Sequence, residues 1–283
     1  GGYAGGLLAR FSPLGGGMHA PSTQRSDRSE TAEIDRVIND VRVALKAAQA
    51  DEGQWVYELE ADATIPAEYI LLEHFLDDID PIVEAKLARY LRRIQGEHGG
   101  WPLFHAGDME VSASVKAYYA LKLVGDDPEA PHMARARAAI LAKGGAAKSN
   151  VFTRISLALF GQVPWHAVPT MPVEIMLLPQ WFPFHLTKVS YWTRTVLVPL
   201  LVLFAKKPRA ANPKGVGIAE LFTRPPFEER NYIVNPTGSR LGDGLIAFDR
   251  ILRQLVPLVP KTLERRAIDA AMAFIKERLN GED

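Results

Sequence analysis

The 283-residue sequence contains no cysteine, which excludes disulfide bonds and thiolate sites. It also carries no net charge, because 33 Lys and Arg balance 33 Asp and Glu, so no nucleic acid partner is expected. No apolar run reaches the roughly 18 residues of a membrane-spanning helix. No signal-peptide pattern opens the sequence either, and the default prediction for its compartment is the cytoplasm.

Strand patterns are missing too, because no useful length of the sequence alternates apolar and polar residues. What is present is helical periodicity interrupted by loops, with 47% hydrophobic residues available for a core. We therefore predict an all-α protein. The expected helices comprise residues 31–48, a segment that includes 70–76, then 82–94, 111–124, 133–141, 152–160, 245–255 and 263–279.

Motifs for cofactors are absent as well: no P-loop, dinucleotide fingerprint, nucleophile elbow or zinc-spaced histidine pair occurs. The acidic cluster Asp77-Asp78-Ile79-Asp80 could hold Mg²⁺ in principle. It closes a helix just before Pro81, however, and this position favours a solvated helix end. We expect no metal ion and no cofactor.

One sequence motif, Q-x-x-x-G-x-W, occurs twice, each time after a segment with helical periodicity. The two copies start 46 residues apart, at Gln49 and Gln95, and a fixed period of this size indicates a repeat architecture. In each copy we expect the helix to end near the Gln, the Gly to supply a turn and the Trp to pack back as a structural plug. The copies consist of Gln49, Gly53 and Trp55, and of Gln95, Gly99 and Trp101.

The ten residues Val196 to Ala205 form an apolar run closed by Lys206 and Lys207. A buried core helix is the favoured interpretation, because the run is too short to span a bilayer. A membrane-facing element that lies in the interface is the alternative, supported by the two lysines and nearby aromatic residues.

Residues 1–30 are rich in Gly, Ser, Pro and Arg without periodicity, and we predict that they are disordered. Residues 31–283 are predicted to form one helical domain. The sequence stops at Leu279-Asn-Gly-Glu-Asp283, where a third repeat turn would begin, so we expect this domain to be truncated.

Glu68 follows Thr64 by about one helical turn, ahead of a fully apolar stretch. A carboxylate on an apolar face is costly unless it is paired or hydrogen-bonded to water. A functional carboxylate and a simple contact within the first helical turn are equally favoured by this pattern.

The two repeats resemble those of the class II triterpene cyclases, and residues 63–72 resemble the matching segment of the squalene–hopene cyclases in particular. The resemblance is colinear over about residues 31–283. Further similar segments are Val115–Lys122, Val151–Arg154, Pro172–Met176 and Ser190–Arg194.

The resemblance implies an α/α barrel, one of the two barrels of a longer enzyme. That enzyme is an isomerase with a hydro-lyase side activity, which cyclises squalene to hopene or hopanol in triterpenoid (hopanoid) biosynthesis without metal or organic cofactor. It further implies a monotopic protein on the cytoplasmic side of the membrane, which takes squalene through an apolar channel. A homodimer is compatible with it.

Individual residues acquire roles only through this resemblance. Trp192 matches a tryptophan of the substrate cavity, and Val189 and Leu197 match positions that line the channel. Thr64, Glu68, Lys116 and Asn150 match the polar network around waters where the final cation loses a proton or captures water. Some family members carry Glu and Arg where this chain has Lys116 and Asn150, and Ser156 replaces an aromatic residue.

The family's acid, an Asp-x-Asp-Asp motif, does not occur in this sequence. In the family it lies downstream, in the other barrel, so we expect this chain to be inactive by itself. The alternative hypothesis is a non-catalytic helical-barrel protein that binds a lipid or a partner chain.

Overall fold

The computed structural model describes residues 23–56, 60–183, 185–235 and 238–279, and every regular element in these ranges is a helix. The one pairing of strand type among them is an isolated antiparallel bridge between Trp101 and Glu110. The predicted all-α fold class is confirmed, as an α/α-barrel domain requires. By contacts the chain divides into unit 1, residues 1–60, and unit 2, residues 61–283.

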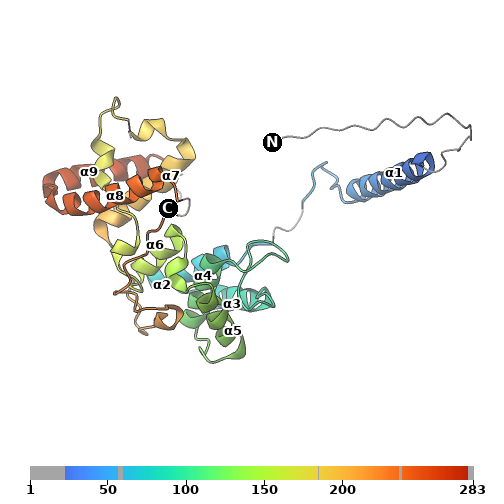
Figure 1. Ribbon diagram of the computed structural model, residues 1–283, viewed down its shortest axis with the longest axis horizontal. Helices are drawn as coiled ribbons and strands as arrows, with labels where there is room; N and C mark the ends of the chain where they lie inside the picture. Colours follow the sequence, from blue (N-terminus) through green and yellow to red (C-terminus); the bar gives the residue numbers. More distant parts are fainter. Residues whose placement is uncertain (1–22, 57–59, 184, 236–237, 280–283) are drawn as a thin grey trace, which may run out of the picture. The chain divides into compact units, whose positions relative to one another are not determined.

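Unit 1 contains the helix α1 (Thr23–Ala47), drawn in blue in Figure 1. It begins at Thr23, so residues 23–30 of the segment predicted to be disordered are helical, and residues 1–22 lie outside the described range. The apolar side chains that predicted this helix lie exposed along it. They are Ile34, Val37, Ile38, Val41 and Leu45.

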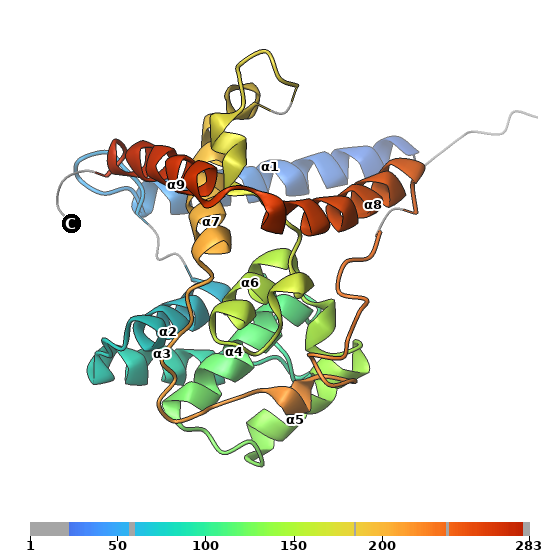
Figure 2. The same cartoon turned by 90° about the vertical axis from the view of Figure 1, so that its left-hand side faces the viewer.

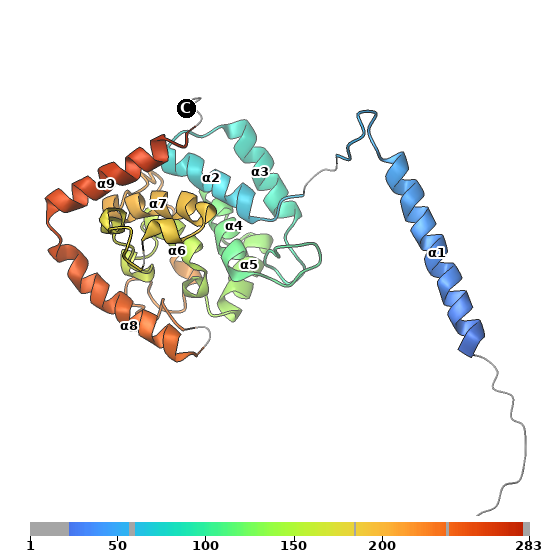
Figure 3. The same cartoon turned by 90° about the horizontal axis from the view of Figure 1, so that it is seen from above.

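Unit 2 holds the remaining helices, and all the predicted ones are confirmed with small shifts of their ends. Figure 3 shows α2, α4, α6 and α7 on the inside, and α3, α5, α8 and α9 around them. The helices are α2 (Thr64–Leu76), α3 (Pro81–Arg93), α4 (Val111–Val124), α5 (Pro131–Ala142), α6 (Val151–Leu159), α7 (Tyr191–Lys206), α8 (Arg240–Leu255) and α9 (Lys261–Lys276).

The core of unit 2 forms around α4, which contacts α2, α3, α5 and α6. Eleven of its residues are buried, from Ser112 to Leu123, so the helix shows no solvent-facing stripe. Small residues such as Ala113 and Ala117 let neighbouring helices approach, while Tyr118 and Tyr119 supply bulk. A helix that is apolar on nearly all sides belongs inside the protein, and α4 is therefore an inner helix.

The α2–α3 corner explains the acidic cluster. Asp77 takes the left-handed conformation that ends α2, with φ of 58°. The side chain of Asp80 accepts hydrogen bonds from the backbone N–H groups of Ile82 and Val83 and so caps α3. These carboxylates are helix-end groups, as the sequence predicted. At the other end of α2, Thr64 is the first helical residue and Ala63 is the N-cap.

The apolar run that ends at Ala205 lies within α7, and Val198, Leu201, Val202 and Phe204 are buried. The prediction of a buried core helix is confirmed. Pro199 stands inside this helix. Among the residues that the structure describes, no helix is long and apolar enough to cross a bilayer.

The two tryptophan turns have the same local geometry. In each copy the side-chain amide of the Gln donates through Nε2 to the carbonyl of the turn glycine, from Gln49 to Gly53 at 2.6 Å and from Gln95 to Gly99 at 2.6 Å. Both glycines have positive φ, 91° and 89°, which a residue with a Cβ would resist. The helices α1 and α3 end at Ala47 and Arg93, just before the two Gln residues, as predicted for this motif.

Both indoles also return to the preceding helix. Trp55 Nε1 donates to the carbonyl of Leu45 at 2.6 Å, and Trp101 Nε1 donates to that of Leu91 at 2.8 Å. The two copies differ in what surrounds them, because Trp101 is fully buried while Trp55 is 46% exposed. The same sequence motif therefore forms the same turn whether its tryptophan is buried or half exposed.

The second copy is covered by the start of α5. Gln95 Nε2 also donates to the carbonyl of His132 at 2.8 Å, and Arg135 donates to Gln95 Oε1 at 2.9 Å. Contact here is so close that a Cβ on Gly99 would lie 2.8 Å from the backbone oxygen of Arg135. The glycine is thus required both by its φ and by the neighbouring helix.

We predict that Trp101→Ala lowers the free energy of unfolding by about 3–5 kcal/mol, the usual cost of removing a fully buried large aromatic side chain. Trp55→Ala should cost about 1 kcal/mol, since chiefly one hydrogen bond and partial burial are lost. Urea unfolding followed by circular dichroism measures both. Equal costs would contradict the difference in burial.

Candidate functional site

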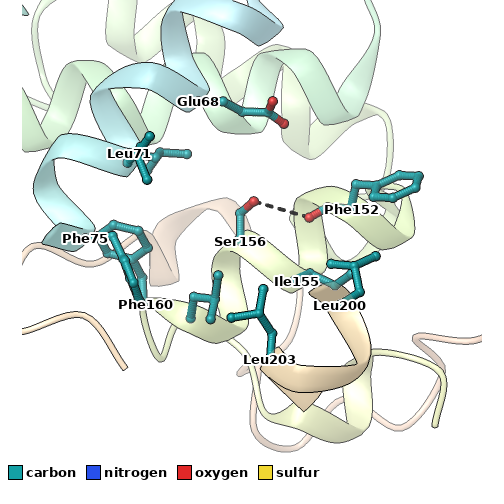
Figure 4. A pocket seen from close by; sticks show the side chains of 11 residues that line it. Glu68, Leu71, Phe75, Phe152, Ile155, Ser156, Phe160, Leu200 and Leu203 are labelled. Carbon is teal, nitrogen blue, oxygen red and sulfur yellow. Dashed lines mark hydrogen bonds between the residues drawn. The ribbon is translucent and has the colours of Figure 1, made fainter. Parts of the chain in front are cut away.

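A pocket of about 420 Å³ opens between α2, α6 and α7 in unit 2 (Figure 4). Its walls are apolar except for the carboxylate of Glu68 and the hydroxyl of Ser156. The apolar walls consist of Leu71, Leu72, Phe75, Phe152, Ile155, Leu159, Phe160, Leu200 and Leu203. Such a pocket suits a hydrocarbon ligand and offers it very few polar contacts.

The pocket follows from helical spacing. Glu68, Leu71, Leu72 and Phe75 are separated by three, one and three residues, so they share one face of α2. The lining residues of α6 repeat the same pattern from Phe152 to Leu159. The spacing in the sequence predicts that these residues share one face of each helix. It does not predict that the two faces lie opposite each other.

Aromatic contacts shape the apolar end of the pocket. The rings of Phe75 and Phe160 meet edge to face with centroids 6.3 Å apart, and Phe160 meets Tyr119 in the same way at 5.3 Å. In Figure 4, Glu68 lies at one end of the pocket, with Ser156 next to it and Phe75 and Phe160 at the other end. The pocket is therefore polar at one end only.

Glu68 is paired with Lys116 of α4, whose Nζ donates to Glu68 Oε1 at 2.7 Å. The Lys116 side chain is 5% exposed, whereas that of Glu68 is 46% exposed. The ammonium therefore lies inside unit 2, and the carboxylate lies on the pocket side. The structure brings together these two residues of the predicted polar network.

The other two residues of the predicted network, Asn150 and Thr64, make local hydrogen bonds at the starts of α6 and α2. Asn150 caps α6, where its Oδ1 accepts from the N–H of Thr153 at 2.9 Å. Its own N–H donates to the hydroxyl of Ser112 at 2.9 Å. The N–H of Thr64 donates to Asp62 Oδ1 at 2.6 Å. No hydrogen bond joins either residue to Glu68 in the described part of the chain.

The predicted cavity and channel residues lie elsewhere in unit 2. Trp192, in the first turn of α7, is 80% exposed, and Val189 just before it is 37% exposed. Leu197 packs partly buried against the smaller apolar cluster between α7 and α9. None of the three lines the pocket that contains Glu68.

A second ionic cluster, which the sequence did not reveal, fixes the far side of α4. Lys122 donates to Glu220 and to the carbonyl of Gly217, and Tyr118 donates to the same carboxylate at 3.0 Å. Burial opposes ionisation of Glu220, but the hydrogen bond from Lys122 holds the pKa of its carboxyl below the usual value. Burial raises the pKa of Tyr118, so its phenol remains a donor.

The attachment of α8 was also not predicted. Asp249 Oδ1 accepts from the N–H of Thr170 at 2.6 Å, and Arg253 donates to the carbonyls of His166 and Val168. This helix thus faces unit 2 with polar groups, and none of its residues is buried. Most of its large apolar side chains are exposed: Leu241, Leu245, Phe248, Ile251 and Leu255, with Leu258 just after them.

Comparison with known proteins shows which family the chain resembles. The family model described as the squalene-hopene cyclase N-terminal domain matches residues 38–283. A squalene–hopene cyclase of Bradyrhizobium diazoefficiens is 54% identical over 266 residues, which cover 93% of this chain and 40% of that relative. One from Zymomonas mobilis is 53% identical over 257 residues, covering 89% of this chain and 38% of the relative.

A more distant squalene–hopene cyclase, from Alicyclobacillus acidocaldarius, is 34% identical over 240 residues, or 84% of this chain and 37% of its own length. The chain therefore spans about two fifths of the length of the relatives that it matches. The matched residues include α2, α4, α6 and α7, and with them the whole pocket.

We predict that the Glu68–Lys116 pair responds asymmetrically to substitution. Glu68→Leu should lower the free energy of unfolding by about 3 kcal/mol, because it leaves a buried ammonium without its counter-charge. Lys116→Met should cost less than about 1 kcal/mol, because the half-exposed carboxylate can be hydrated. The double variant should resemble Lys116→Met. Urea unfolding of the set measures this, and a larger cost for Lys116→Met would contradict it.

Proposed function

The chain belongs to the family of squalene-hopene cyclase N-terminal domains, and from this we propose that it forms one barrel of a longer cyclase that converts squalene to hopene or hopanol. The observation that carries the proposal is the apolar pocket with one carboxylate, which lies wholly within the residues matched by the family model. In this proposal, squalene is the substrate and the reaction is an intramolecular cyclisation.

The chain contributes walls and a polar end to the cavity, and it does not contribute the acid. Protonation of an unactivated alkene requires a strong acid, and the sequence contains no Asp-x-Asp-Asp. We propose that the acid lies in the part of the longer protein that this chain does not include. Trp192 would then complete the cavity opposite that part, where its exposed indole face suits a carbocation.

The pocket end with Glu68 suits the last step, in which the final cation loses a proton or captures water. Glu68 is the only ionisable group among the residues that line the pocket. The apolar walls stabilise cyclised hydrocarbon by dispersion and exclude bulk water from the cations. Thr64 lies one turn before Glu68 on α2 and can extend this polar end. Asn150 supports it indirectly, by capping α6.

We further propose that the longer protein rests on a membrane surface, from which it takes squalene. The exposed apolar side chains of α8 support this, because the polar side of the helix is used for its attachment to unit 2. Figures 1 and 2 both show α8 and α9 at the end of unit 2 away from α3 and α5. Val189, just before α7, and Leu197, on α7, would line the entrance from that surface.

We expect the isolated chain to form no pentacyclic product from squalene in detergent, whereas the longer protein that contains it does. Gas chromatography with mass spectrometry detects the product. Product from the isolated chain would refute the assignment of the acid. A longer protein that binds squalene in the pocket without any turnover would favour the alternative function, a helical-barrel lipid-binding protein.

For the membrane, we expect the double variant Leu245→Asp/Phe248→Asp to lose liposome binding by more than about tenfold, since each buried apolar side chain contributes about 1.5–3 kcal/mol. Flotation of the longer protein with phospholipid vesicles measures this. Ile82→Asp is the matched control, because Ile82 is equally apolar and 66% exposed but belongs to α3, at the other end of unit 2. Equal losses in both would contradict a specific role of α8.

A further inference from the structure

The first turn of α7 carries Trp192, and this turn lies outside the apolar cluster that joins α7 to α9. The cluster uses residues of α7 from Leu197 onward. Trp192 is 80% exposed, so its own packing within the described chain does little to fix it. Helix ends fray more readily than helix centres. The position of the indole therefore depends on the contacts that hold this first turn.

Local contacts and a distant contact hold the turn. Ser190 caps α7, where its Oγ accepts from the N–H of Thr193 at 3.1 Å. The guanidinium carbon of Arg194 lies 5.9 Å from the centre of the Tyr191 ring. The distant contact comes from just beyond the end of α9, where the guanidinium carbon of Arg278 also lies 5.9 Å from the centre of this ring. At this range a guanidinium is attracted to the face of an aromatic ring.

Arg278 is itself fixed at the end of α9, which packs against α7 (Figure 3). Its Nη1 donates to the carbonyl of Phe274 at 2.7 Å, one of the last carbonyls of the helix. Its guanidinium carbon lies 3.5 Å from the centre of the Phe274 ring. Its Nε is buried and makes no hydrogen bond within the described residues. The guanidinium thus contacts one aromatic ring of α9 and reaches toward another on α7.

Capping of α9 alone does not explain this geometry. A basic side chain near a helix C-terminus is favourable while its charge stays in water, and Lys276 already supplies one in the last turn. Arg278 instead gives up most of its hydration, because its side chain is only 27% exposed. The cation–π contact with Tyr191 offsets part of that loss, and it joins α9 to the turn that precedes the apolar cluster.

We propose that Arg278 is a positioning residue for Trp192. It holds the ring of Tyr191, the neighbouring residue in the same turn, and so fixes where α7 begins and where the exposed indole stands. This inference rests on the proposed function, in which Trp192 forms part of the substrate cavity. It goes further because it assigns a task to a residue of α9 that lines neither the pocket nor the cavity.

A misplaced indole has a specific chemical consequence. An intermediate carbocation that loses the stabilisation of the indole face persists less well, and a ring-forming step competes less well with early termination. In early termination a C–H bond next to the cation breaks, its electron pair forms a C=C bond, and the proton passes to water. The product then has fewer than five rings. Loss of Arg278 should therefore change which products form as well as the rate.

The experiment uses the longer protein that contains this chain, with squalene in detergent and products identified by gas chromatography with mass spectrometry. For Arg278→Met we expect the share of products with fewer than five rings to rise about fivefold and kcat/KM to fall about threefold. Trp192→Ala should change the products in the same direction and further. Arg265→Met is the matched control, an exposed arginine of the same helix, and should keep the parental products.

A second pair of variants tests the ring itself. Tyr191→Phe keeps the aromatic face and should keep the parental products, whereas Tyr191→Leu removes the face and should behave like Arg278→Met. Arg278→Met combined with Tyr191→Leu should add little to either single change, because both remove the same contact. This pair also decides the question if Arg278→Met proves too unstable to assay.

The outcomes separate the proposed function from the positioning role. If the unsubstituted longer protein forms no pentacyclic product, the proposed function fails. If it does, but Trp192→Ala keeps the parental products, the cavity role of Trp192 fails and the positioning role with it. Parental products from both Arg278→Met and Tyr191→Leu would overturn the positioning role alone. An equal change in Tyr191→Phe or Arg265→Met would also overturn it, because neither variant removes the contact between the guanidinium and the ring.

Discussion

The burial of α4 is the constraint on which the rest of unit 2 depends. This inner helix carries several polar side chains, and inside a protein each of them must find a partner or lose about 1–3 kcal/mol. Each partner comes from a different segment. Ser114 accepts from the N–H of Trp101, Lys116 pairs with Glu68, and Lys122 reaches Glu220. The helix therefore ties the tryptophan turn, the pocket and a distant loop to one another.

This arrangement links the repeat to the candidate site. The second tryptophan turn is fixed from below by Ser114 of α4 and from the side by the start of α5. Two residues further along α4 is Lys116, which pairs with Glu68 on α2. The same helix therefore contacts both the second tryptophan turn and the carboxylate of the pocket. Asn150 likewise supports the site from a distance, because it caps α6, the helix that forms the opposite wall of the pocket.

The helices of unit 2 differ in how they meet their surroundings. The inner helix α7 buries Val198, Leu201, Val202 and Phe204, so its ten-residue apolar run reflects packing. The outer helix α8 does the reverse, with polar contacts inward through Asp249 and Arg253 and apolar side chains outward. Hydropathy alone cannot distinguish these cases, because both helices contain enough apolar residues for either use.

Sequence patterns alone determined the helical fold, the ends of most helices and the form of the tryptophan turns, because these depend on contacts within a few residues. Helical spacing also determined that Glu68 shares a face with Leu71, Leu72 and Phe75. Only the tertiary structure decided that α6 and α7 close this face into a pocket, and that Lys116, distant in sequence, lies behind Glu68. It also separated Trp101 from Trp55, since burial depends on what packs against a turn and the turn itself does not encode its neighbour.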